Sequence, residues 1–70
     1  MSMMYKKHLI EPASYYLRDL GLWSVRGHIL HDEGNATISR EFDCGRGYQN
    51  KRDAELDFIH YAHRIIDAEQ

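Results

Sequence analysis

The residues most able to do chemistry in this 70-residue sequence are its five histidines and its single cysteine. His60 and His63 are one helical turn apart and Asp67 follows one turn later, so these three side chains could meet a divalent metal. Two histidines and one acid on an exposed helix lack a fourth ligand, and Asp67 can instead pair with His63 at i,i+4. We interpret this face as a solvated helix surface and predict no bound metal or cofactor.

A hydrolase-like pairing of His28 with Ser39 is a second candidate, because the two residues are predicted neighbours on adjacent strands. A nucleophile also needs an orienting group and an oxyanion site in a concave pocket. A flat exposed sheet offers neither, and His31 lies on the opposite face from His28. Cys44 is predicted across from Trp23, where lone cysteines are usually small buried hydrophobes. We therefore predict no enzymatic activity.

Four arginines and one lysine are candidates for binding an anion. In the predicted register Arg40 lies on the apolar face opposite Gly27, with its guanidinium reaching solvent or a helix acid such as Glu55. A β-bulge that turns Arg40 outward is the competing interpretation. The other four basic residues are Arg26 on the polar face and Arg46, Lys51 and Arg52 around the start of a helix. A helix N-terminus between glycines can bind phosphate, but this spacing fits no phosphate-loop pattern and we favour a solvated connector.

The strands that position these residues form a predicted hairpin between Trp23 and Cys44. With Asp32-Glu33-Gly34-Asn35 as the turn and His31 opposite Ala36, one register sorts apolar from polar side chains on both strands. The apolar face pairs Ile29 with Ile38, Val25 with Phe42 and Trp23 with Cys44. The polar face pairs His28 with Ser39, Arg26 with Glu41 and Ser24 with Asp43.

One further strand precedes the hairpin and one helix follows it. Tyr5 to Ile10 favours a strand that Pro12 places at an edge, at a bulge or at its end, and that Tyr15–Leu17 can continue. Asn50 is a predicted helix N-cap, and apolar residues then recur at spacings of three and four up to Asp67. The predicted core consists of Trp23, Val25, Ile29, Ile38, Phe42, Phe58, Ala62 and Ile65.

The predicted fold is a single α+β domain over residues 1–70, a three-stranded antiparallel β-meander with one C-terminal amphipathic helix packed on one face. Net charge is −2, which disfavours nucleic-acid binding because that affinity depends on neutralising phosphates. The sequence shows neither a signal peptide nor an apolar run long enough to span a membrane. With a lone cysteine, this favours a cytoplasmic protein.

A set of short motifs runs along the chain: Tyr5-Lys6, Ile10-x-Pro12, Gly21-x-Trp23, Arg26-Gly27-x-Ile29, Asp53-Ala54-Glu55, Ala62 and Ile65-Ile66-Asp67. In these motifs most of the chain resembles the HlyU-type small proteobacterial proteins. His8 stands where that family has an aromatic residue, and Glu41-Phe42-Asp43-Cys44 replaces its usual strand end. The resemblance implies a β-β-β-α domain and a link to transcriptional activation, and it carries over no catalytic residue.

These observations lead to one predicted function and two alternatives. We expect a small non-enzymatic interaction or regulatory module, acting as a homodimer or on another protein. The contact surface is the polar sheet face away from the helix, where Leu22 and Leu30 also lie, or an exposed edge strand. The alternatives are a transcription-linked regulator with weak nucleic-acid contact and, last, a metal-binding or enzymatic protein. The predicted interaction surface comprises Arg26, His28, Ser39, Arg40, Glu41, Arg46, Lys51 and Arg52.

Overall fold

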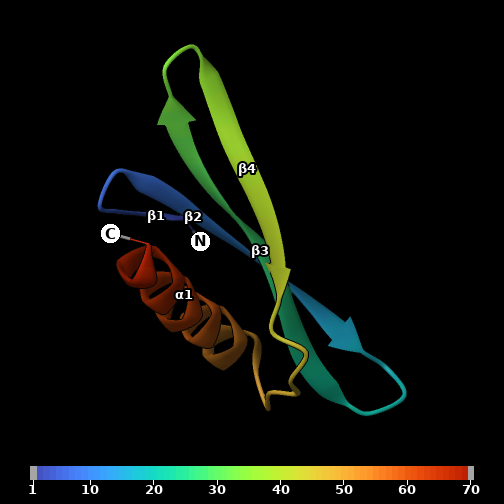
Figure 1. Cartoon of the computed structure of the whole chain (residues 1–70). Helices are drawn as coiled ribbons and strands as arrows, with labels where there is room; N and C mark the ends of the chain where they lie inside the picture. Colours follow the sequence, from blue (N-terminus) through green and yellow to red (C-terminus); the bar gives the residue numbers. More distant parts are fainter. Residues whose placement is uncertain (1, 70) are drawn as a thin grey trace.

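A computed structural model describes residues 2–69 of the chain and shows one antiparallel sheet with one helix against it (Figure 1). The sheet has four strands in the order β1-β2-β3-β4, where the sequence analysis predicted three. Their bounds are β1 Met3–Tyr5, β2 His8–Leu17, β3 Leu22–Glu33 and β4 Ala36–Asp43, followed by α1 Lys51–Ala68. The α+β class and the C-terminal helix are confirmed.

The extra strand arises because the first predicted strand is split by a tight turn at Lys6 and Lys7. Both residues have positive φ, 48° and 67°, as both central residues of a type I′ hairpin turn require. Lysine is not a usual residue at these positions, so Lys6 and Lys7 are not recognisable as a turn from the sequence. Tyr5 and His8 close the hairpin as cross-strand partners.

Pro12 does not interrupt β2, which continues past it to Leu17 opposite β3. Proline lacks an N–H and is tolerated where that group would face an open side of the sheet. The described residues of β1 pair with β2 only as far as Ile10, so none of them lies beside Pro12. Of the three predicted positions for Pro12, at an edge, at a bulge or at a strand end, the strand end is wrong, since β2 runs on to Leu17 as an inner strand of the sheet.

The β3–β4 hairpin has the predicted faces but a register shifted by two residues. Glu33 pairs with Ala36, and the turn contains Gly34 and Asn35 alone, with Gly34 at φ 67°. Ile38 consequently faces His31 rather than Ile29, and Phe42 faces Gly27 rather than Val25. Side chains alternate with a period of two, so the shift changes every cross-strand partner while leaving each side chain on its predicted face.

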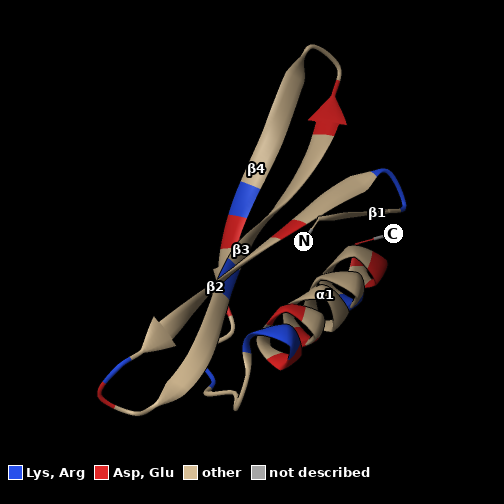
Figure 2. Ribbon diagram, turned by 180° about the vertical axis from the view of Figure 1, so that it is seen from behind, with Lys and Arg blue, Asp and Glu red and all other residues tan. Residues whose placement is uncertain are grey.

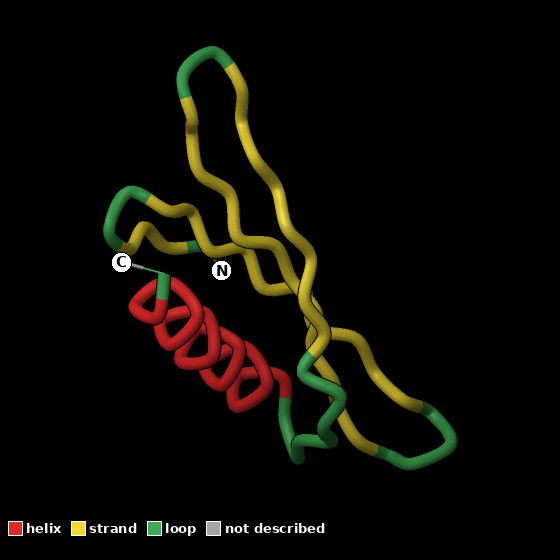
Figure 3. Tube along the Cα trace, in the orientation of Figure 1, coloured by secondary structure: helices red, strands yellow, loops and turns green. Residues whose placement is uncertain are grey.

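Helix α1 begins at the predicted cap. The Asn50 side chain accepts a hydrogen bond from the backbone N–H of Asp53 at 2.9 Å, and Asp53 supplies the acid in the first turn. The helix lies across β2 and β3 on one face of the sheet, as Figure 3 shows. The β3–β4 hairpin extends beyond the C-terminal end of the helix, and we call this projecting part, residues 30–39, the distal ribbon.

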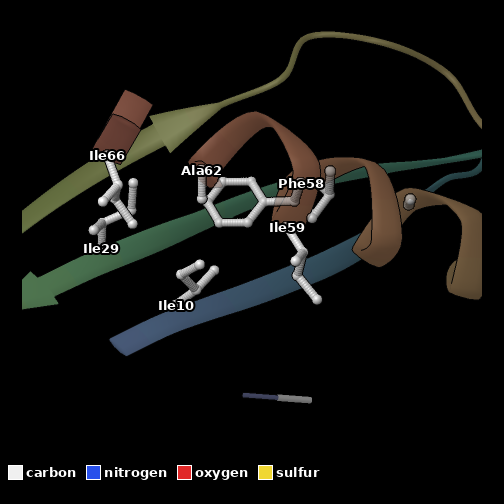
Figure 4. Packing of buried hydrophobic residues seen from close by; sticks show 8 residues of the cluster. Ile10, Ile29, Phe58, Ile59, Ala62 and Ile66 are labelled. Carbon is white, nitrogen blue, oxygen red and sulfur yellow. The ribbon is translucent and has the colours of Figure 1, made fainter. Parts of the chain in front are cut away.

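The core lies between α1 and the covered face of the sheet, and Figure 4 shows its central side chains. Phe58 packs over Gly27, where an added Cβ would lie 2.6 Å from the ring. Of the predicted core, Val25, Ile29, Phe58 and Ala62 are buried, and Trp23, Phe42 and Ile65 pack against them; Ile38 is 36% exposed, because the register shift moves it into the distal ribbon. The remaining buried hydrophobic residues are Ile10, Ala54, Ile59 and Ile66.

Candidate functional site

The face of the sheet turned away from α1, here called the outer face, is not covered by any described element. Pairing within the sheet aligns Met4, Leu9 and Leu30 side by side across β1, β2 and β3. We call these three residues the apolar row. They line a hollow of about 250 Å³ whose remaining walls come from Lys7, His31, Asp32 and Thr37. The outer face therefore presents an apolar depression with a lysine and an aspartate at its margin.

A band of charged side chains crosses the outer face beside the apolar row. Glu11, His28 and Glu41 are cross-strand neighbours, and the His28 Nε2 atom lies 3.5 Å from a Glu41 carboxylate oxygen. In the next position along the sheet, Arg26 pairs with Asp43 at 4.0 Å. The side chains in both contacts are about half exposed, and exposed contacts between charged groups each stabilise a protein by at most ~1 kcal/mol. They leave the band charged and open to a partner.

Aromatic and aliphatic side chains occupy the other end of the outer face. The Tyr15 ring lies 5.2 Å from the Arg26 guanidinium, and the Tyr15 hydroxyl donates to Asp43 at 3.3 Å. Leu17 and Leu22 are cross-strand partners beyond it. The outer face thus alternates between apolar, charged and apolar zones, which is the composition of many protein–protein contact surfaces.

The eight predicted surface residues divide between different parts of the molecule. Arg26, His28, Ser39 and Glu41 lie together on the outer face, although Ser39 faces Leu30 rather than His28, and Glu41 faces His28 rather than Arg26. The register shift of two residues explains both changes. The remaining four residues are Arg40, Arg46, Lys51 and Arg52, which do not lie on this face.

Arg40 points to the helix side of the sheet, as the sequence predicted, but its partner is Glu69 and not Glu55. Both guanidinium NH groups donate to the two Glu69 carboxylate oxygens, one of them at 2.8 Å. This contact raises the pKa of Arg40 and lowers the pKa of Glu69. Glu55 is buried and accepts a hydrogen bond from Ser14 at 2.9 Å. The arginine therefore connects β4 to the C-terminal end of the helix.

The basic residues do not form a shared patch within residues 2–69. Arg26 and Arg40 are on opposite faces of the sheet, each paired with an acid. Arg46 lies 3.9 Å from Asp57, and Lys51 and Arg52 are exposed in the first turn of α1. Figure 2 shows blue segments separated by red ones along the chain. This distribution does not provide the continuous positive surface that tracks a phosphate backbone.

Cys44 borders a smaller hollow of about 150 Å³ between the end of β4 and α1, lined also by Asp43, Arg46, Asp57, Tyr61 and Arg64. Burial raises the pKa of the Cys44 thiol, which disfavours the thiolate that nucleophilic chemistry requires. The neighbouring Tyr48 hydroxyl donates to Asp57, and burial together with this bond raises the pKa of Tyr48. The arrangement holds the connector against the helix and does not activate the cysteine.

Two of the three residues considered as metal ligands, His63 and Asp67, make other contacts. His63 stacks on Tyr5 with ring centroids 3.9 Å apart. Asp67 accepts hydrogen bonds from the Tyr5 hydroxyl at 2.9 Å and from the Lys6 ammonium at 2.7 Å. In the described part of the chain, no three His, Cys, Asp or Glu side chains are grouped as a metal ion would need.

Sequence reasoning missed Met4 and Leu9 as surface residues, because β1 was not predicted. The turn at Lys6 and Lys7 carries no sequence signal, and without it Met4 has no position beside Leu9. Leu30 was already placed on the uncovered face. The alternation of Leu9 with Ile10 was the available signal, since one of two adjacent apolar residues in a strand must face away from the core.

No family model, no curated protein and no solved structure is similar enough to this chain to be matched. The resemblance to HlyU-type proteins therefore stays a prediction. Within residues 2–69, no helix combines the length and the apolar character that crossing a membrane requires.

Proposed function

We propose that this protein is a small non-enzymatic interaction module that binds another protein chain through the outer face of its sheet. The observation that supports this proposal is the apolar row of Met4, Leu9 and Leu30 around a hollow on a sheet face without a covering layer. An α+β sheet normally buries one face against helices and leaves the other polar. Apolar residues beside a hollow on the uncovered face favour contact with a partner.

The chemistry of the surface also indicates what kind of partner fits. Met4 is 63% exposed, and methionine adapts to partner side chains of different shape. The adjacent band of Glu11, His28 and Glu41 favours a partner that brings a basic group next to an apolar one. The dispersed arginines and the net charge of −2 do not favour nucleic acid as that partner. The cytoplasmic location and the absence of catalysis remain predictions from the sequence.

Site-specific photo-crosslinking in the cells that make the protein tests this proposal. A photoreactive amino acid replaces Met4 in one version, and in the matched control it replaces Leu56, an exposed apolar residue of α1. We expect a discrete adduct from position 4 that is absent from position 56, and that is lost when Leu30→Lys is added to the first version.

Circular dichroism shows whether Leu30→Lys remains folded, and Leu9→Lys provides a second disruption of the same row. Equal adducts from positions 4 and 56, or an adduct from position 4 that persists in folded Leu30→Lys and Leu9→Lys variants, would contradict binding through the outer face.

A further inference from the structure

The open edge of β4 has backbone hydrogen-bonding groups that no strand among residues 2–69 pairs with. The backbone N–H of Cys44 donates to the Val25 carbonyl at 3.1 Å, and Trp23 exchanges two backbone bonds with Tyr48. The odd-numbered residues of β3 therefore bond toward β4, and their partners on β4 are even-numbered, such as Arg40 opposite Ile29. Bonding alternates along an antiparallel strand, so the groups that face the open edge belong to Thr37, Ser39, Glu41 and Asp43.

The two edges of the sheet differ in how they are protected. β1 has three residues, and Pro12 lies in the part of β2 that β1 leaves open. β4 has eight residues, and it contains neither proline nor lysine. Residues 36–39 carry no charged side chain, and the end of β4 nearest the β3–β4 turn is tan in Figure 2. Short strands, proline and charged side chains, lysine above all, are the usual means by which edges avoid pairing. In β4 the charged residues begin only at Arg40, so residues 36–39 have none of these protections.

We propose that the open edge of β4 pairs with β4 of a second copy of this chain, antiparallel about a two-fold axis, to form one continuous sheet. This inference goes beyond the proposed function, because it adds a second copy of the chain at the β4 edge, beside the outer face. Since only odd-numbered residues face the edge, odd residues must pair with odd residues across the axis. The two registers with the longest overlap place either Ser39 or Arg40 on the axis.

Charge distinguishes these two registers. With Arg40 on the axis, the two Arg40 residues are directly opposite, and like charges directly opposite destabilise a sheet. With Ser39 on the axis, Thr37 faces Glu41 of the other copy, Ala36 faces its Phe42, and Ile38 faces its Arg40. This register opposes no like charges, and we assign it to the dimer.

The same register joins the two outer faces. Ser39 is the β4 partner of Leu30, and Leu30 is the β3 partner of Leu9. A two-fold axis at Ser39 therefore aligns the apolar row of one copy with that of the other across a pair of serines. Two such rows in line form a longer contact surface than either copy presents alone, which links self-association to binding through the outer face.

Sedimentation equilibrium of the full chain tests whether association depends on the β4 edge. We expect the mass to rise from 8.3 kDa to twice that value between ~10 μM and ~1 mM, since pairing through one strand buries little area and is weak. Ser39→Pro removes an edge N–H from each copy and should weaken the dimer by about tenfold or more. The matched control Ser39→Ala keeps the N–H and should dimerise like the parent. A monomer mass throughout, or equal dimerisation by a folded Ser39→Pro variant, would overturn the proposal.

Cysteine cross-linking tests the register without requiring the proline variant to fold. On a Cys44→Ala background, Ser39→Cys places two thiols at the axis, where paired Cα atoms ~5.5 Å apart allow a disulfide. Thr37→Cys is the control, since its thiol faces Glu41 of the other copy and not its own equivalent. We expect a covalent dimer from Ser39→Cys and not from Thr37→Cys. Equal cross-linking of both, or of neither, would overturn the assigned register.

Leu30→Lys distinguishes this inference from the proposed function. It changes the outer face and leaves the β4 backbone intact, so it should abolish the photo-crosslinked adduct of a different protein while the Ser39→Cys disulfide still forms. If Leu30→Lys removes both the adduct and the disulfide, the two copies do not associate through the β4 edge. If the adduct from position 4 persists in the Ser39→Pro variant while the parent protein sediments as a monomer, the binding partner is a different protein. The proposal that a second copy of this chain binds would then be wrong.

Discussion

The helix-covered part of the sheet and the distal ribbon contain similar side chains in very different surroundings. Ile29 on β3 and Ile38 on β4 both point to the helix side, yet Ile29 is fully buried and Ile38 is 36% exposed. The difference comes from α1, which ends at Ala68 before the hairpin does. One helix is about 10 Å wide and covers about two strands spaced 4.8 Å apart. The sheet is larger than the area that one helix can cover, and the uncovered part of the sheet is available for binding.

The largest effect expected from this comparison is at the centre of the covered part. Phe58→Ala removes the side chain that packs over Gly27 and should lower the free energy of unfolding by about 3–5 kcal/mol. Small domains have total stabilities not far above that loss, so the variant should be largely unfolded. Urea denaturation followed by circular dichroism measures the change. A midpoint equal to that of the parent would show that α1 does not pack where the structure places it.

The same substitution at Ile29 and Ile38 compares the two regions directly. Ile29→Ala should cost about 2–5 kcal/mol because it leaves a cavity in the core. Ile38→Ala should cost less than about 1 kcal/mol, since the side chain is already partly in water. Equal costs at the two positions, measured by the same denaturation experiment, would contradict the register shift that puts Ile38 in the distal ribbon.

A smaller effect is expected at the β1–β2 turn, which holds β1 beside the core. Lys7 has φ 67°, a conformation that costs about 1 kcal/mol or more in a residue with a Cβ and little in glycine. Lys7→Gly should therefore stabilise the protein by up to about 1 kcal/mol, whereas Lys7→Ala should not. Thermal unfolding of the two variants side by side tests this; a lower melting temperature for Lys7→Gly than for Lys7→Ala would contradict the turn geometry.

The smallest effect concerns pH and the end of α1. Hydrogen bonds from Lys6 and Tyr5 lower the pKa of Asp67 below its ordinary value of 3.8, and Arg40 lowers the pKa of Glu69 below 4.5. A lowered carboxyl pKa gives stability that is present above the ordinary value and is lost as pH falls through the folded value. The free energy of unfolding should therefore decline on acidification below about pH 4.5.

Asp67→Asn should remove part of that acid-dependent decline, because the amide does not titrate. The matched control is Asp19→Asn in the exposed β2–β3 turn, which should keep the decline. Denaturation at a series of pH values compares them, and an unchanged pH profile for Asp67→Asn would contradict a stabilising role for its contacts with Tyr5 and Lys6.

The same comparison explains which parts of the structure were predictable. The helix, its Asn50 cap and the face of each strand residue followed from periodicities of 3.6 and two, which depend only on local sequence. The hairpin register did not follow, because registers that differ by two residues sort apolar from polar side chains equally well. Only the loop length distinguishes them, and Asp32-Glu33-Gly34-Asn35 was interpreted as a longer turn than Gly34 and Asn35 form.

The candidate site was predictable to the same extent. Arg26, His28, Ser39 and Glu41 were correctly placed on one surface, because face assignment survives a shift of two. The contact between Arg40 and Glu69 depends on where α1 ends relative to β4, which local sequence does not determine. The apolar row was missed because it needs β1, and β1 depends on two lysines in a backbone conformation that their sequence does not predict.

Amide hydrogen exchange along β4, followed by NMR in dilute and in concentrated solution, tests the central claim that the open edge of β4 is a binding surface. In dilute solution the amides of Ile38, Arg40 and Phe42 should be protected by β3, while those of Thr37, Ser39 and Glu41 exchange freely. In concentrated solution these three odd-numbered amides should become protected while the others are unchanged. Odd-numbered amides that exchange equally fast at both concentrations, or that are already protected in dilute solution, would contradict the account.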